Sequence, residues 1–264
     1  MNTALVIARN TISEALRRKV LNAFAMVGVA VICLTFMFGQ FTARQEFTLI
    51  RGMGLGIITL AGIFITVILS INLIPTEIER RTIYTILAKP VRRPDFLLGK
   101  YFGALGTIFI NIALMSVVFV IALAAKQMLT GAEGQPSPLE MFKGVLMIYM
   151  QMLLLSSVAI FLSVFLSPLV NFFLTLSLFI IGNMSTFTLD LAKTGGNIFV
   201  RGFFTAVHYI VPNFGNFQFT NPLVNPGVQV KSEVLFLTQN VIYAIVYAAV
   251  LMILAILIFD RREV

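Results

Sequence analysis

Residues 75–103 read PTEIERRTIYTILAKPVRRPDFLLGKYFG and form the strongly charged stretch of a chain that is otherwise almost continuously apolar. Thr76 and Glu79 have the spacing of a capping box, which predicts a helix that begins at Glu77 with acidic residues in its first turn. Pro90 ends this helix, because a proline inside a helix lacks the N–H donor and clashes with the preceding turn. The stretch therefore predicts a short capped helix between two apolar segments.

The predicted helix covers residues 77–88 and is amphipathic. Its apolar face consists of Ile83, Ile86 and Leu87. On another face, Glu77 lies four residues before Arg81, a spacing that favours an ion pair on a helix surface. A basic, capped helix between two apolar segments is suited to contact a partner outside the membrane.

This stretch resembles the corresponding region of type 2 ABC exporter permeases. The residues that carry the resemblance are Glu77, Ile78, Glu79, Thr82, Leu87, Pro90, Gly99 and Lys100. In that family the stretch is the cytoplasmic coupling helix, which docks onto a separate ATPase subunit. The resemblance therefore implies an ATPase-coupling site made of Glu77, Glu79, Arg80, Arg81, Thr82, Ile83, Ile86, Leu87 and Pro90.

A narrower resemblance concerns one branch of the family. Arg81 stands where the broad family often has glycine, and residues 8–20, ARNTISEALRRKV, resemble the N-terminus of the branch linked to multicopper-enzyme maturation.

The composition requires lipid as the solvent. Hydrophobic residues make up 59% of the chain and charged residues 11%, with a mean hydropathy of +0.97. Soluble domains average about 25% charged residues, so this chain cannot cover itself with polar surface. The net charge of +8 does not indicate nucleic-acid binding, because the basic residues flank apolar segments instead of forming a solvated domain.

The sequence predicts an all-α integral membrane protein with six transmembrane helices, an N-terminal interfacial helix and the cytoplasmic coupling helix. The interfacial helix covers residues 3–19, with a basic face toward anionic lipid and an apolar face made of Leu5, Ala8, Ile12, Ala15 and Leu16. The predicted spans are residues 20–38, 52–74, 97–125, 141–166, 169–189 and 235–259. Residues 190–234 form an external loop, in which the apolar run 198–211 predicts a re-entrant or interfacial helix. In the family that this chain resembles, short helices of this connection close the outer mouth of the pathway.

The basic residues predict the orientation. Twelve of the nineteen lysines and arginines fall on the side that holds both termini and the 75–103 stretch. Because basic loops stay in the cytoplasm, both termini and this stretch are predicted to be cytoplasmic, in a multi-pass protein of the inner (plasma) membrane.

Catalytic and metal-binding patterns are missing from the sequence. No GxxxxGK[ST] motif occurs, so ATP and magnesium are expected in a partner subunit, and no cofactor is expected in this chain. His208 is the single histidine, which excludes a multi-histidine metal site. Cys33 is the single cysteine and is predicted to be a small buried hydrophobe. No acidic pair lies inside a span, which argues against a proton-coupled secondary transporter.

A few polar and small residues lie within the spans. Pathway lining and interhelical packing are both open for Asn72, Asn111, Gln151 and Asn183. The Gly99-x-x-x-Gly103 spacing predicts a close helix contact, either inside the subunit or across a dimer.

These patterns and the resemblance together predict the permease subunit of an ABC transporter. It would export a substrate as a homodimer, or paired with a similar permease subunit, and bind two copies of a cytoplasmic ATPase. The lipid bilayer would surround it, and no nucleic-acid partner is expected. The alternative is a membrane-embedded assembly or scaffold protein that uses the charged stretch as a docking site without transport.

Overall fold

A computed structural model describes residues 3–39, 46–79, 92–130, 138–194, 198–218 and 232–261. Within these ranges the secondary structure is entirely helical, which confirms the all-α membrane fold. The first helices are α1 (Thr3–Leu16), α2 (Lys19–Gly39), α3 (Glu46–Asn72), α4 (Pro75–Glu79) and α6 (Arg93–Thr130). They are followed by α7 (Pro138–Ser163), α8 (Pro168–Asn183), α9 (Ser185–Thr194), α10 (Ile198–Ile210), the 3-10 turn η1 (Gly215–Gln218) and α11 (Glu233–Asp260).

Five of the described helices are long and apolar enough to cross a membrane: α2, α3, α6, α7 and α11. A sixth crossing is formed if α8 and α9 are taken as one span that bends by 70°. The predicted span at 169–189 thus corresponds to two helices, with the bend at Met184.

The bend in this span has a tertiary cause. The Gly182 carbonyl accepts a hydrogen bond from the Phe214 N–H at 3.1 Å. A Cβ on Gly182 would lie 2.3 Å from the Pro212 carbonyl oxygen, so only glycine permits this approach. The end of α8 is therefore shaped by a segment about thirty residues further along the chain, which hydropathy does not predict.

Prolines mark the starts of several described helices. Pro75 and Pro138 are the first residues of α4 and α7, Pro94 is the second residue of α6, and Pro168 opens α8. Proline fits the first helical turn, where its missing N–H has no helical partner. For this reason α4 begins at Pro75, before the predicted start at Glu77.

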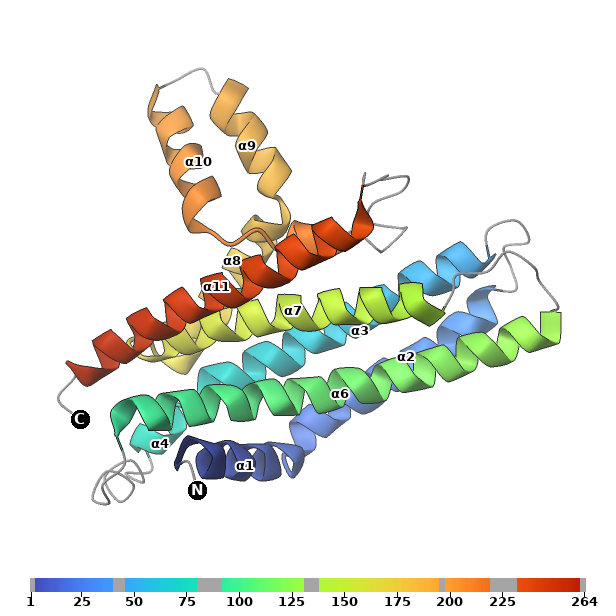
Figure 1. Ribbon diagram of the computed structural model, residues 1–264, viewed down its shortest axis with the longest axis horizontal. Coiled ribbons are helices and arrows are strands. Elements are labelled where there is room, and N and C mark those ends of the chain that lie inside the picture. The colour runs from blue at the N-terminus through green and yellow to red at the C-terminus, as the bar shows by residue number, and fades with distance from the viewer. Residues whose placement is uncertain are drawn as a thin grey trace.

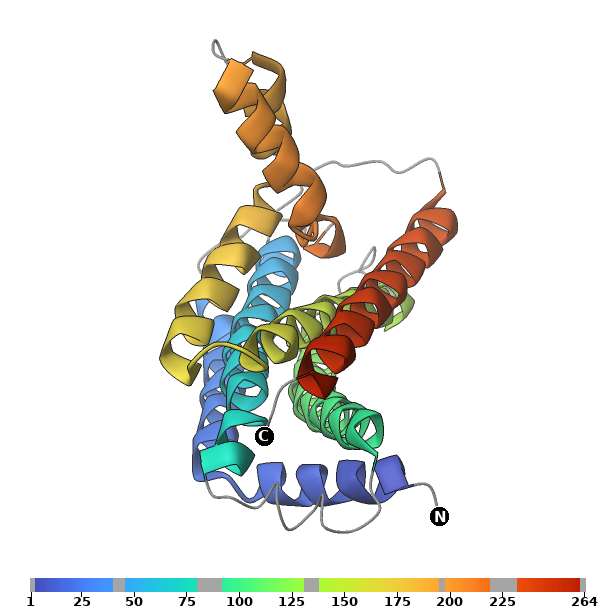
Figure 2. The same cartoon turned by 90° about the vertical axis from the view of Figure 1, so that its left-hand side faces the viewer.

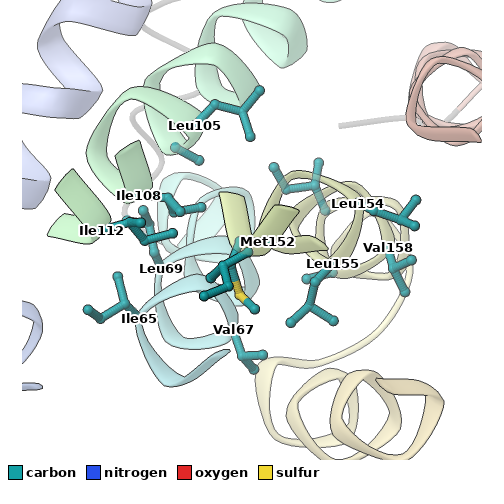
Figure 3. Close-up of a cluster of buried hydrophobic side chains, with 14 of the residues drawn as sticks. Ile65, Val67, Leu69, Leu105, Ile108, Ile112, Met152, Leu154, Leu155 and Val158 are labelled. Atoms are coloured by element: carbon teal, nitrogen blue, oxygen red, sulfur yellow. The ribbon is translucent and has the colours of Figure 1, made fainter. Parts of the chain in front are cut away.

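The long helices form a bundle with α3 and α7 at its centre (Figure 1). About two-thirds of the apolar window of α3 and of α7 is buried (67% in each), compared with 22% in α11. Figure 3 shows part of this core, where Ile65 and Leu69 of α3 lie beside Ile108 and Ile112 of α6. Two tyrosines join α6 to α7 in both directions: Tyr101 donates to the Leu153 carbonyl at 3.3 Å, and Tyr149 to the Leu105 carbonyl at 3.5 Å.

Ion pairs mark the two ends of the bundle. Lys126 of α6 pairs with Glu46 of α3, and Lys143 of α7 pairs with Glu233 of α11 at 2.6 Å. At the opposite end, α4, the start of α6 and the end of α11 lie close together, with α1 beside them (Figure 1). We call this the α4 end of the bundle.

Helix α1 packs across α6 at the α4 end, as Figure 2 shows from that side. A Cβ on Gly103 would lie 2.5 Å from Cβ of Thr11 and 2.9 Å from the Ala8 carbonyl oxygen, so glycine is needed for this contact. The Gly99-x-x-x-Gly103 contact therefore lies inside the subunit.

The face of α1 that packs on α6 includes part of the predicted apolar face, since Ala8 and Ile12 lie against glycines of α6 and Ala15 is buried. Leu5 was expected on it, but its side chain is 67% exposed, and Thr11 is buried in its place. Thr11 fits because its hydroxyl donates to the Ile7 carbonyl of its own helix at 2.9 Å. A small residue suits the glycine groove better than a large apolar one.

Candidate coupling site and central segment

The described part of the predicted coupling site begins at α4. Glu77 does not point away from the protein: its Oε1 lies 2.6 Å from Nζ of Lys100 on α6. The side chains are 18% and 7% exposed, so both charges are largely removed from solvent. The Lys100 ammonium also lies 5.8 Å from the centroid of the Phe96 ring.

The other residues of the predicted coupling site contribute less to the described structure. Glu79 is the last residue of α4. The remaining residues lie outside the described ranges: Arg80, Arg81, Thr82, Ile83, Ile86, Leu87 and Pro90. Their assignment to a docking helix stays a prediction from the sequence.

A second connection at the α4 end joins α6 to α11. Arg93 donates to the carbonyl oxygens of Phe259 at 3.2 Å and Asp260 at 3.0 Å, which are among the last carbonyls of α11. Beside this cap, the rings of Phe96 and Phe259 stack with their centroids 6.3 Å apart. The first turn of α6 is therefore fixed to the last turn of α11.

Sequence reasoning missed both connections. Glu77 was expected to pair with Arg81, which lies outside the described residues, and its ion pair with Lys100, 23 residues away, was not predicted. A signal was present, since a lysine at an apolar helix end needs a counter-charge when it is buried, and few acids are near enough. The Arg93 cap left no sequence signal, because any residue of α11 supplies the same carbonyl groups.

Among the described residues between α9 and α11, 211–218 are the most enclosed, and we call them the central segment. Phe214 and Phe217 in this segment are fully buried, whereas α10 before it has no buried residue. Gln151 of α7 donates its amide to the Phe214 carbonyl at 3.0 Å. The Tyr243 hydroxyl of α11 accepts the Asn213 N–H at 3.0 Å, and Tyr247 donates to the Ile210 carbonyl.

These contacts place the central segment deep in the bundle. Gln151 lies near the middle of α7, and Tyr243 and Tyr247 lie near the middle of α11. Non-helical backbone at this depth of a membrane protein requires hydrogen-bond partners from the protein, and the side chains of α7 and α11 supply them. The sequence placed the re-entrant element at residues 198–211, and the buried part lies just beyond it.

Most of the other polar residues of the spans satisfy their own helix. The amides of Asn72, Asn111 and Asn183 each donate to the carbonyl four residues earlier, at 2.8 to 2.9 Å. Contacts between helices come from Gln151, from the Ser70–Ser156 hydroxyl pair at 2.9 Å, and from Asn171, which donates to the Ala159 carbonyl at 2.9 Å. The assignment of these side chains to pathway lining or to packing stays a prediction from the sequence.

The comparison with family models settles the family. The model described as ABC-2 family transporter protein matches residues 3–264. The chain belongs to the ABC-2 transporter family. It is therefore a multi-pass membrane permease subunit of an ABC transporter. A comparison with curated proteins returns no similar sequence. The match does not single out the multicopper-maturation branch, which stays a prediction.

The permease shows no metal centre in the part of the chain that the structure describes, where no three histidine, cysteine or acidic residues cluster. Nδ1 of His208 lies 3.4 Å from Oγ of Ser185, which connects α10 to α9. Cys33 is exposed on α2, and the prediction that it is buried was wrong. Its thiol is compatible with lipid, so burial in protein was not required.

The permease also has two apolar grooves along α11. One has a volume of about 840 Å³ and is lined mainly by α11, with Phe161 of α7 and Ile210 of α10. The other, of about 420 Å³, lies between α11 and α6. The residues that line both grooves are almost all apolar, which suits contact with lipid chains.

Proposed function

We propose that this permease exports a substrate across the inner membrane, driven by ATP hydrolysis in a separate cytoplasmic ATPase. Two permease subunits, in the simplest case two copies of this chain, would bind two ATPase subunits. Residues 77–88 would form the docking helix, and the α4 end of the bundle would face the cytoplasm.

The observation that carries this proposal is the arrangement around residues 80–91. Helix α4 leads into this charged stretch and α6 follows it, and Glu77 and Lys100 pair where the two helices meet. A basic stretch held between two fixed helix ends is suited to receive a partner and to pass on its movement. The twelve basic residues on this side support a cytoplasmic location.

The proposal also concerns the hairpin of α9 and α10, which we assign to the outer half of the bundle. Helices α9 and α10 form a hairpin that projects from the bundle (Figure 1), and α10 exposes Phe199 (82%) and Tyr209 (77%). Exposed aromatic residues of this size suit the outer lipid layer better than water. We place this hairpin in the outer leaflet, anchored by the central segment.

The test is reconstitution of the permease in vesicles with its partner ATPase. The permease alone should show no saturable ATP binding by calorimetry, because it lacks a P-loop. With the partner, ATP hydrolysis should be stimulated by the permease and should drive substrate movement. A complex that assembles without ATP-dependent transport would favour the scaffold alternative.

A further inference from the structure

The short helix α4 is not a simple continuation of α3. A turn at residues 73–74 separates the two helices, and Pro75 has no N–H to continue the hydrogen bonding of α3. The polar side-chain connection from α4 to the neighbouring bundle helix is the Glu77–Lys100 ion pair, with 2.6 Å between Oε1 and Nζ.

Because it is buried, this ion pair is a stable connection between α4 and α6. The Lys100 side chain is 7% exposed and lies over the Phe96 ring, so water cannot replace Glu77 as its partner without opening the packing. An exposed ion pair on a protein surface exchanges easily with water, whereas a buried cation left without its counter-charge is strongly unfavourable. A displacement of α4 should therefore move Lys100 with it.

Beyond Lys100 the structure is continuous. Helix α6 is a single helix of 38 residues that carries α1 on its glycine groove and reaches Glu46 at the opposite end through Lys126. Its first turn is fixed to the last turn of α11 by Arg93 and by the stacking of Phe96 on Phe259. A movement that reaches Lys100 is thus passed to α6 and α11 together.

From this arrangement we infer that Lys100 is a positioning residue, which with Glu77 transmits the movement of the docking stretch to α6 and α11. The inference rests on the proposed function, because it is the partner ATPase that would move this stretch. It goes beyond the docking role predicted for residues 77–88, because the Glu77 carboxylate is paired with Lys100 of the same subunit. It also predicts which helices move together: α6 with α11, relative to α8.

The experiment measures this movement without a substrate. In a Cys33→Ser background, spin labels at Phe102→Cys on α6 and Leu169→Cys on α8 report the distance between these helices, since both side chains are exposed. The permease is placed in nanodiscs with the ATPase, without nucleotide or trapped with ATP and vanadate. The matched control carries labels at Phe102→Cys and Leu257→Cys, which report the distance from α6 to α11.

Trapping the wild-type complex should shift the α6–α8 distance and leave the α6–α11 distance unchanged. The double variant Glu77→Gln/Lys100→Met removes both charges, so it leaves no charge buried alone. In complexes of this variant that hold the ATPase, the α6–α8 shift should be lost. The exchanged pair Glu77→Lys/Lys100→Glu should recover the shift, because it restores the ion pair with its charges reversed.

Two results would overturn the inference while the proposed function stands. One is a wild-type-like shift in the uncharged double variant. The other is loss of ATPase binding in that variant, which would assign Glu77 and Lys100 to the docking surface itself. Failure of the wild-type permease to bind the ATPase would instead refute the proposed function, and the inference with it.

Discussion

Gln151 shows how one residue holds a non-helical segment inside the bundle. Its amide nitrogen donates to the Phe214 carbonyl, and its side chain is fully buried. Its Oε1 has no hydrogen-bond partner among the described residues. A buried amide oxygen without a hydrogen-bond partner is unfavourable, and the hydrogen bond of the amide nitrogen offsets part of that cost. That bond fixes the central segment, and with it the base of the α9–α10 hairpin.

The variant Gln151→Met should lower the free energy of unfolding by about 1–2 kcal/mol, because it leaves the Phe214 carbonyl without this donor. The variant Gln151→Glu should cost more, because it places a carboxylate against a carbonyl oxygen in a buried site. Denaturant unfolding in detergent measures both. As a control, Gln239→Met at an exposed position of α11 should stay within about 0.5 kcal/mol of the wild type. Wild-type stability of Gln151→Met would show that the central segment is held by its phenylalanines alone.

At the scale of elements, the sequence predicts what local chemistry determines. Long apolar runs and prolines place α2, α3, α6, α7 and α11, since the membrane thickness sets their length. Contacts between distant residues escape prediction. The bend after α8 depends on Phe214, the pairing of Glu77 depends on Lys100, and the packed face of α1 depends on a glycine groove in α6. The docking stretch therefore stays a prediction from the sequence, and the connections of Glu77 and Arg93 beside it escaped prediction.

Glycine substitutions test the packing of α1 on α6. Gly103→Ala places a Cβ 2.5 Å from Thr11, so α1 should be displaced from its groove. A cysteine at Ala15, which is 2% exposed, should then react faster with a thiol reagent in a Cys33→Ser background. The control Gly202→Ala on α10 has no atom within 4 Å of its new Cβ. It should leave Ala15→Cys protected and should stabilise α10 by up to about 1 kcal/mol. Equal protection in both variants would mean that α1 is not held by the glycine groove.

At the scale of the whole molecule, the described helices form a bundle with two different ends. The ion pairs of Lys126 with Glu46 and of Lys143 with Glu233 lie at one end. The other end, where Glu77 pairs with Lys100, gathers α1, α4, the start of α6 and the end of α11 (Figure 1). The charge bias of the sequence assigns this second end to the cytoplasm. Every part of the proposed coupling mechanism depends on that orientation.

Cysteine labelling in intact cells tests the orientation. In a Cys33→Ser background, an impermeant thiol reagent added from outside should label Ser137→Cys, which lies in the predicted external loop between the third and fourth spans. Arg92→Cys, which is exposed at the α4 end, should be labelled only after the membrane is opened. The reverse pattern would overturn the assignment of both ends.

The central claim is that a separate ATPase docks on residues 77–88, and its affinity for the permease in nanodiscs tests this most directly. Burying one large apolar side chain is worth about 1.5–3 kcal/mol, and about 1.4 kcal/mol corresponds to a tenfold change in affinity. The account therefore predicts saturable binding of the ATPase to the wild type and binding weakened by more than about tenfold in Ile86→Glu. Arg80→Ala, as the matched control, should cost less than about 1 kcal/mol. Full-affinity binding to Ile86→Glu would contradict the docking role of this stretch.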